Sequence, residues 1–133
     1  MNLYGWLMVA GGGILGCLLR WRLGVLFNPL FPTVPLGTIA ANLAAGFVIG
    51  ISIALSEHYA TVPAEVRLFL ATGFCGGLST MSTFAAESFT LISKNELLWG
   101  AAHLGMNVIG SILMVMIGIQ FVRFILSGGG AIL

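Results

Sequence analysis

Neutral polar side chains recur at a spacing of four along two apolar stretches of the chain. Thr38 and Asn42 are four residues apart in one stretch, and His103, Asn107 and Ser111 follow the same spacing in another. Residues four apart lie on one face of a helix, so each stretch would carry a polar stripe. Such a stripe can line a path for a small polar solute, or it can form interhelical hydrogen bonds worth under about 1 kcal/mol each. Two stripes that both contain asparagine favour the lined path.

A third polar cluster lies in the segment GFCGGLSTMSTF, which runs from Gly73 to Phe84. Its glycines weaken a helix and its hydroxyls can replace lost backbone hydrogen bonds, so the segment predicts a break in a helix. Freed carbonyls and N–H groups at membrane depth can bind ions where protein or water covers them. An unbroken helix with a packing face of small residues is the alternative. The residues concerned are Gly73, Gly76, Gly77, Ser79, Thr80, Ser82 and Thr83.

The ionisable residues near these clusters bear on the charge of the solute. Arg20 lies near the end of an apolar stretch, Phe84 offers the positive edge of its ring, and there is no acidic ring. These features favour a small anion over a cation, and water or a small polyol would also suit the amides and hydroxyls. Glu87, seven residues after Thr80, is either a proton-coupling carboxylate or a hydrogen-bonded acid with Thr83 as its partner. We favour the hydrogen-bonded role.

The elements that must position these residues are membrane helices. Of the 133 residues, 59% are hydrophobic and 7% are charged, which is far more apolar than a soluble domain of this length needs. Four apolar windows are long enough to cross a hydrocarbon layer of roughly 30 Å. The sequence therefore predicts a single all-α membrane domain, residues 1–133, with both termini on one side of the bilayer. The expected spans are residues 3–22, 36–55, 68–92 and 97–122, and the third carries the expected break.

Basic residues give the chain almost no preferred orientation. With four spans, Arg20, Arg22 and Lys94 fall on one face of the bilayer, and Arg67 and Arg123 fall on the other. An excess of Lys and Arg in short loops sets the orientation of a membrane protein. The balance here is compatible with dual topology, in which the chain inserts both ways, and also with a fixed orientation set by one or two charges.

More than one copy of the chain is expected in the assembly, because four spans can barely surround a path. A two-fold dimer is the simplest such assembly. Glycines four residues apart would let helix backbones approach closely, either within the chain or between copies. The pairs are Gly12 with Gly16, Gly46 with Gly50, and Gly73 with Gly77.

Four segments resemble the CrcB/Fluc family of bacterial fluoride channels. They are GGGILGCLLRW, GTIAANLAAGFVIG, GFCGGLSTMSTFAAES and NVIGS, one from each expected span, so that the resemblance covers nearly the whole chain. The resemblance implies an antiparallel homodimer of dual topology in the lipid bilayer of the bacterial inner membrane. It also implies two fluoride pathways and a structural sodium ion at the dimer centre. The implied function is passive export of fluoride, which relieves fluoride toxicity.

The resemblance further implies roles for individual residues. Asn42 matches the asparagine of the pore, Arg20 the arginine of the vestibule, and Phe84 the second of two pore phenylalanines. Gly76 and Ser79 match the positions whose backbone carbonyls hold the sodium. The other residues expected along or beside the fluoride pathway are Thr38, Thr80, Met81, Ser82, Thr83, Glu87, His103, Asn107 and Ser111.

The chain departs from the family pattern at one position. That pattern reads Ser/Thr-Thr-Phe-Ser-Thr-Phe, and Met81 stands where the first phenylalanine belongs. A phenyl edge carries partial positive charge, whereas a thioether is flexible and only weakly polar. We expect Met81 to preserve selectivity and to alter conductance.

Two other classes of protein are alternatives. A small four-span, proton-coupled exporter of cations or drugs needs an embedded acid, which families of that kind carry in the first span, and here the candidate is Glu87 in the third. A scaffold subunit would leave the asparagine stripes unexplained. An enzyme is not expected, because the sequence has no nucleophile and base pair or metal-ligand cluster at plausible spacing. No nucleic-acid partner is expected either.

Overall fold

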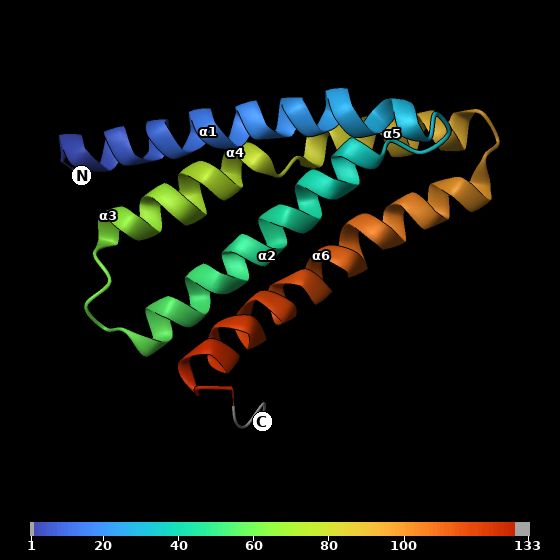
Figure 1. The fold of residues 1–133 in the computed structure, drawn as a ribbon. Coiled ribbons are helices and arrows are strands. Elements are labelled where there is room, and N and C mark those ends of the chain that lie inside the picture. The colour runs from blue at the N-terminus through green and yellow to red at the C-terminus, as the bar shows by residue number, and fades with distance from the viewer. Residues whose placement is uncertain (1, 130–133) are drawn as a thin grey trace.

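The computed structural model describes residues 2–129 as an all-helical bundle (Figure 1). It contains four helical stretches that are long and apolar enough to cross a membrane: Leu3–Leu30, Leu36–His58, Ala64–Ser93 and Leu97–Leu126. These stretches agree with the predicted all-α, four-span fold, and they extend past the ends of the expected spans because helices can project beyond the hydrocarbon layer. The chain is therefore a multi-pass membrane protein.

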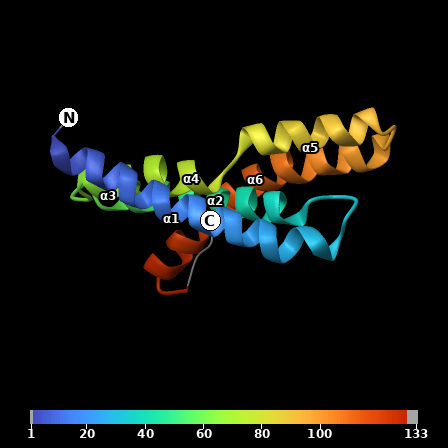
Figure 2. The same ribbon diagram turned by 90° about the horizontal axis from the view of Figure 1, so that it is seen from above.

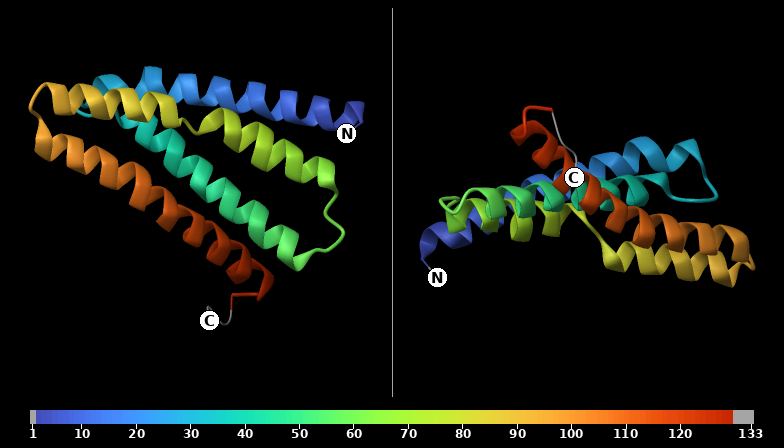
Figure 3. Two further views of the ribbon diagram at one scale, coloured as in Figure 1. Left: turned by 180° about the vertical axis from the view of Figure 1, so that it is seen from behind. Right: turned by 90° about the horizontal axis from the view of Figure 1, so that it is seen from below.

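The helices follow one another with short connections. They are α1 (Leu3–Phe27), the 3-10 turn η1 (Asn28–Leu30), α2 (Leu36–His58), α3 (Ala64–Arg67), the π-helical η2 (Leu68–Cys75), α4 (Gly76–Leu78), α5 (Met81–Ser93) and α6 (Leu97–Leu126). The start of α1, the connection 59–63 and the end of α6 lie toward one end of the bundle, and the connections 31–35 and 94–96 lie toward the other (Figures 1 and 3). The two ends of the described chain therefore lie on the same side.

The third span is interrupted between α4 and α5. Ser79 (φ −74°, ψ 155°) and Thr80 (φ −148°, ψ 117°) are extended, and α5 begins at Met81. The glycines that suggested the break do not form it, because Gly76 is helical (φ −62°, ψ −38°) and Gly73 and Gly77 lie inside η2 and α4. The interpretation that glycines adopt unusual dihedrals here is wrong. The extended residues are a serine and a threonine.

The break carries the third span from one neighbouring helix to another. Before the break, η2 and α4 pack against α1, and after it α5 packs against α6. Figure 2 shows the chain turning away from α1 after α4 and then running beside α6. Helix α2 contacts both groups, since it packs on α1, η2 and α6. The interruption therefore lies where all parts of the bundle meet.

Glycines let these helices approach closely. A Cβ on Gly12 would overlap the Phe69 carbonyl oxygen of η2, and a Cβ on Gly50 would overlap the Val115 carbonyl oxygen of α6. The remaining members of the three predicted pairs, Gly16, Gly46, Gly73 and Gly77, also face the backbone of another helix. All three pairs thus serve packing within the chain.

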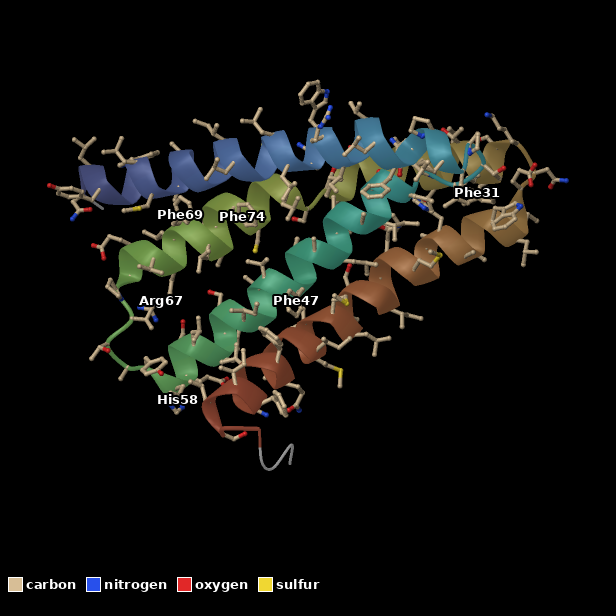
Figure 4. The ribbon with its side chains drawn as sticks, viewed as in Figure 1. Phe31, Phe47, His58, Arg67, Phe69 and Phe74 are labelled. Carbon is tan, nitrogen blue, oxygen red and sulfur yellow. The ribbon has the colours of Figure 1, made fainter. Side chains whose placement is uncertain are left out.

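Aromatic contacts join α6 to the rest of the bundle at two places. Phe47, in the middle of α2, lies 5.6 Å from Phe121 of α6 between ring centroids. Phe31 meets Trp99 edge to face at 5.2 Å and ties the connection before α2 to the start of α6. Figure 4 shows Phe47 halfway along α2 and Phe31 at the end of the bundle where α2 begins.

Candidate functional site

The break is stabilised by the side chain of Asn42, which pairs with the backbone of Thr80. The N–H of Thr80 donates to Asn42 Oδ1 at 2.8 Å, and Asn42 Nδ2 donates to the Thr80 carbonyl at 3.3 Å. Unsatisfied backbone groups are costly at membrane depth, where no bulk water replaces a lost hydrogen bond. The asparagine therefore supplies at the break the two bonds that a continuous helix would have made.

A chain of amides continues from the break into α6. Asn42 Nδ2 donates to Asn107 Oδ1 at 2.8 Å, and Asn107 Nδ2 donates to the His103 carbonyl at 2.9 Å. A side-chain amide has two N–H hydrogens, so both hydrogens of Asn42 are used, one by Thr80 and one by Asn107. The two stripes that the sequence placed on separate helices are thus joined, and Asn42 supports the break with no N–H left over for a solute.

The half-buried acid Glu87 lies next to this chain. Thr38 Oγ1 donates to Glu87 Oε1 at 2.7 Å. Glu87 Oε2 lies 3.2 Å from His103 Nε2, but the two atoms are not aligned as a hydrogen bond and each is without another partner among residues 2–129. His103 is fully buried. Glu87 therefore accepts a hydrogen bond, and its donor is Thr38 of α2 instead of the expected Thr83.

Capping of the break leaves two backbone carbonyls without their helical donors. In a continuous helix the N–H of Thr80 would bond the carbonyl of Gly76, but it donates to Asn42. The N–H of Thr83 would bond the carbonyl of Ser79, but it donates to Thr80 Oγ1 at 3.2 Å. The carbonyl oxygens of Gly76 and Ser79 are thereby made available to another ligand.

Two cavities meet at Thr80. The first, which we call the vestibule, has a volume of about 570 Å³ and lies between α1, α2 and α5. The second, which we call the groove, has a volume of about 510 Å³ and lies between α2, the break and α6. Thr80 lines both cavities. A route between the vestibule and the groove would therefore have to pass Thr80.

The expected pathway residues divide between these cavities and the polar chain behind them. The vestibule is lined by Arg20, Thr38, Thr80, Thr83 and Glu87, and the groove by Asn42, Gly76, Ser79, Thr80, Met81, Phe84, Asn107 and Ser111. Ser82 is exposed and His103 is buried, and neither lines these two cavities. His103 instead contacts the Phe84 ring at 5.5 Å between centroids. It therefore belongs to the support of the site.

One contact was not suggested by any sequence pattern. Arg20 Nε of α1 donates to the carbonyl of Gly77 in α4 at 3.0 Å. The two residues are 57 positions apart in the sequence, so periodicity within a span cannot connect them.

Comparison with known proteins identifies close similarity over nearly the whole chain. Residues 7–119 match the family model described as CrcB-like protein, Camphor Resistance (CrcB). The chain is 44% identical over 125 residues to a protein of Nitrosospira multiformis named fluoride-specific ion channel FluC, in a match that covers 94% of this chain and 98% of that relative. Proteins with the same name in Nitrosomonas europaea and Pseudomonas syringae pv. maculicola are 46% and 45% identical over 121 and 113 residues. Those matches cover 91% and 85% of this chain, and 95% and 89% of the relatives.

Replacement of Asn42 should destabilise the break itself. In Asn42→Ala the N–H and carbonyl of Thr80 lose their partners, at a cost of about 1–3 kcal/mol for each group that stays buried. We expect a clearly lower thermal unfolding midpoint in detergent and faster hydrogen exchange at the Thr80 amide. Thr90→Ala is the control, because the exposed Thr90 hydroxyl bonds only Ala86 of its own helix. Equal thermal unfolding midpoints and equal rates of hydrogen exchange at the Thr80 amide in the two variants would contradict the stabilising role of Asn42 at the break.

Proposed function

The chain belongs to the CrcB family, and on this premise we propose that it conducts fluoride as an antiparallel homodimer with two pathways. It is a fluoride channel, as its relatives are named, and it is not an enzyme. In our proposal the channel lies in the bacterial inner membrane, where fluoride leaves the cell passively and its toxicity is relieved. The proton-coupled exporter is set aside, because the relatives are named as channels.

The observation that carries the proposed pathway is the meeting of the vestibule and the groove at Thr80. A small anion that loses its water must find hydrogen-bond donors and positive edges along its route. Arg20 places a positive charge in the vestibule, which Glu87 also lines with a carboxyl group bonded to Thr38, and the Phe84 ring lies in the groove. The two cavities thus offer an anion favourable groups on both sides of the break.

Hydroxyl groups are the free donors along this route. Within residues 2–129 the hydroxyls of Thr80, Thr83 and Ser111, which line the cavities, donate to no protein group, whereas the Thr38 hydroxyl donates to Glu87. Asn42 has no free N–H, as shown above. We therefore assign donation to the fluoride ion to Thr83 in the vestibule, to Thr80 between the two cavities and to Ser111 in the groove. Ser82 lies at the exposed start of α5 and lines neither cavity.

The residues at the break fit the proposed sodium ion. Unwound backbone carbonyls coordinate sodium in membrane proteins, and the carbonyls of Gly76 and Ser79 have lost their helical donors to Asn42 and Thr80. Gly76 is exposed, and a Cβ there would meet nothing within 4 Å. These carbonyls would hold the ion, which would supply a fixed positive charge near the anion pathway.

A second copy of the chain is the occupant that suits the open side of the groove. The groove presents polar groups of Asn42, Ser79 and Ser111, and Met81 at its edge is 75% exposed. Lipid tails have no hydrogen-bonding groups for such a lining, whereas protein or enclosed water does. The nearly balanced basic residues support two oppositely inserted copies.

Fluoride efflux from liposomes tests the channel directly. Purified protein in liposomes loaded with potassium fluoride should release fluoride when valinomycin is added, and should release no chloride when loaded with potassium chloride. Phe84→Ile removes the positive ring edge from the groove and should slow fluoride release at least severalfold. Phe89→Ile is the control, because Phe89 is 71% exposed on α5 and lines neither cavity. No fluoride release from correctly folded protein would refute the assigned function.

Met81→Phe should bring fluoride throughput closer to the family norm. The substitution places a positive ring edge where a weakly polar thioether now stands in the groove. We expect an altered efflux rate, severalfold higher, with chloride still excluded. Met106→Phe is the matched control, because Met106 is exposed on α6 and lines neither cavity. An efflux rate unchanged from the original protein would rule out a role for position 81 in conductance.

Labelling of single cysteines tests the proposed dual topology. In a background of Cys17→Ser and Cys75→Ala, a reporter Thr61→Cys lies at one end of the bundle and a reporter Glu96→Cys at the other. A membrane-impermeant maleimide on intact cells without an outer membrane should label about half of each reporter, because both orientations are present. Full labelling of one reporter and none of the other would establish a fixed orientation and exclude the antiparallel dimer.

A further inference from the structure

The guanidinium of Arg20 is bonded to backbone at the end of α4. Its Nε donates to the Gly77 carbonyl at 3.0 Å, and Arg20 is half-buried. No carboxylate of residues 2–129 lies within 4.0 Å of this guanidinium, and the close contacts between acidic and basic side chains found there join His103 with Glu87 and Arg123 with Glu57. This hydrogen bond therefore ties α1 to the last turn before the break. The same side chain places a positive charge in the vestibule.

The carbonyls at this helix end have different partners. The Cys75 carbonyl accepts from the N–H of Ser79 at 2.9 Å and from its hydroxyl at 2.8 Å. The Gly77 carbonyl accepts from Arg20. The Gly76 carbonyl lies between these two, and its own helical donor, the N–H of Thr80, is held by Asn42. The carbonyls of Cys75 and Gly77 on either side are thus bonded, while the Gly76 carbonyl, like that of Ser79, has lost its helical donor.

We propose that Arg20 is a positioning residue for the cation site, and that it acts by holding the Gly77 carbonyl so that the neighbouring Gly76 carbonyl stays directed to the sodium ion. This inference rests on the sodium ion of the proposed function. The competing role for Arg20 is attraction of anions into the vestibule by charge alone. The two roles depend on different properties of the side chain, which are its Nε–H donor and its positive charge.

Matched substitutions separate the donor from the charge. Glutamine places an N–H donor the same number of bonds from the backbone as arginine Nε but carries no charge, so Arg20→Gln preserves the bond to Gly77. Methionine has similar length with neither donor nor charge, so Arg20→Met removes both. Arg22→Gln is the control for charge, because Arg22 is exposed at the same end of α1.

The measurement is the change of the thermal unfolding midpoint with sodium concentration. A purely structural role for Arg20 would change the midpoint itself but not its dependence on sodium. The thermal unfolding midpoint of the detergent-purified protein is measured while sodium chloride replaces N-methylglucamine chloride at constant ionic strength. A ligand of the folded state raises the midpoint in proportion to its binding. A lost hydrogen bond at a charged site corresponds to roughly a tenfold change in affinity. We therefore expect Arg20→Met to need about ten times more sodium for half of the effect, while Arg20→Gln and Arg22→Gln behave as the original protein.

Three results would overturn the inference. Equal sodium dependence in Arg20→Met and the original protein would leave the sodium ion in place and exclude a role for Arg20 in holding it. Arg20→Lys keeps the charge and remains usable if Arg20→Met misfolds. If the unfolding midpoint still rises with sodium in Arg20→Lys but no longer does so in Arg20→Gln, the charge of Arg20 is the property that matters. No sodium response in the original protein would remove the proposed cation site, and the inference with it. Fluoride efflux from the same preparation reports the channel function independently.

Discussion

The pair of hydrogen bonds between the Asn42 side chain and the Thr80 backbone is the interaction on which the architecture depends. It stabilises two extended residues in the middle of a membrane span, where an interruption would otherwise leave backbone groups unpaired. Because the span is interrupted there, its first half can follow α1 and its second half can follow α6. The same interruption leaves the Gly76 and Ser79 carbonyls without their helical donors, and Thr80 within it lines both the vestibule and the groove.

Periodicity within single spans predicted much of this arrangement. Four apolar windows were enough for the all-α fold, and a spacing of four correctly placed Thr38 and Asn42 on one helical face. Both side chains in fact point from α2 to the third span, where they contact Glu87 and Thr80. Contacts between different spans could not be obtained in this way. The choice of Thr38 over Thr83 as the donor to Glu87 depends on how α2 packs against α5, and no spacing along one helix contains that information.

The glycines show why one sequence signal can have two meanings. Gly73 and Gly77 lie in the last helical turns before the break, and glycine both permits unusual dihedrals and allows close packing. In the structure only the packing property is used, because these residues are helical and face the backbone of α1. The dihedrals of the break are adopted by Ser79 and Thr80, in extended conformations open to any residue. What the break requires is a partner for its backbone, and that partner is a side chain on another helix.

Polar side chains in this bundle therefore serve two separate purposes. Asn42, Asn107 and Thr38 use their donors on other protein groups, so the fold consumes their hydrogen-bonding capacity. The hydroxyls of Thr83 and Ser111 line the cavities and donate to no group of residues 2–129. A desolvated anion gains only from donors that are not already engaged, because exchanging one hydrogen bond for another contributes little. In the proposed function, conduction and stability thus depend on different polar residues, and a residue's place on a helical face does not by itself decide which purpose it serves.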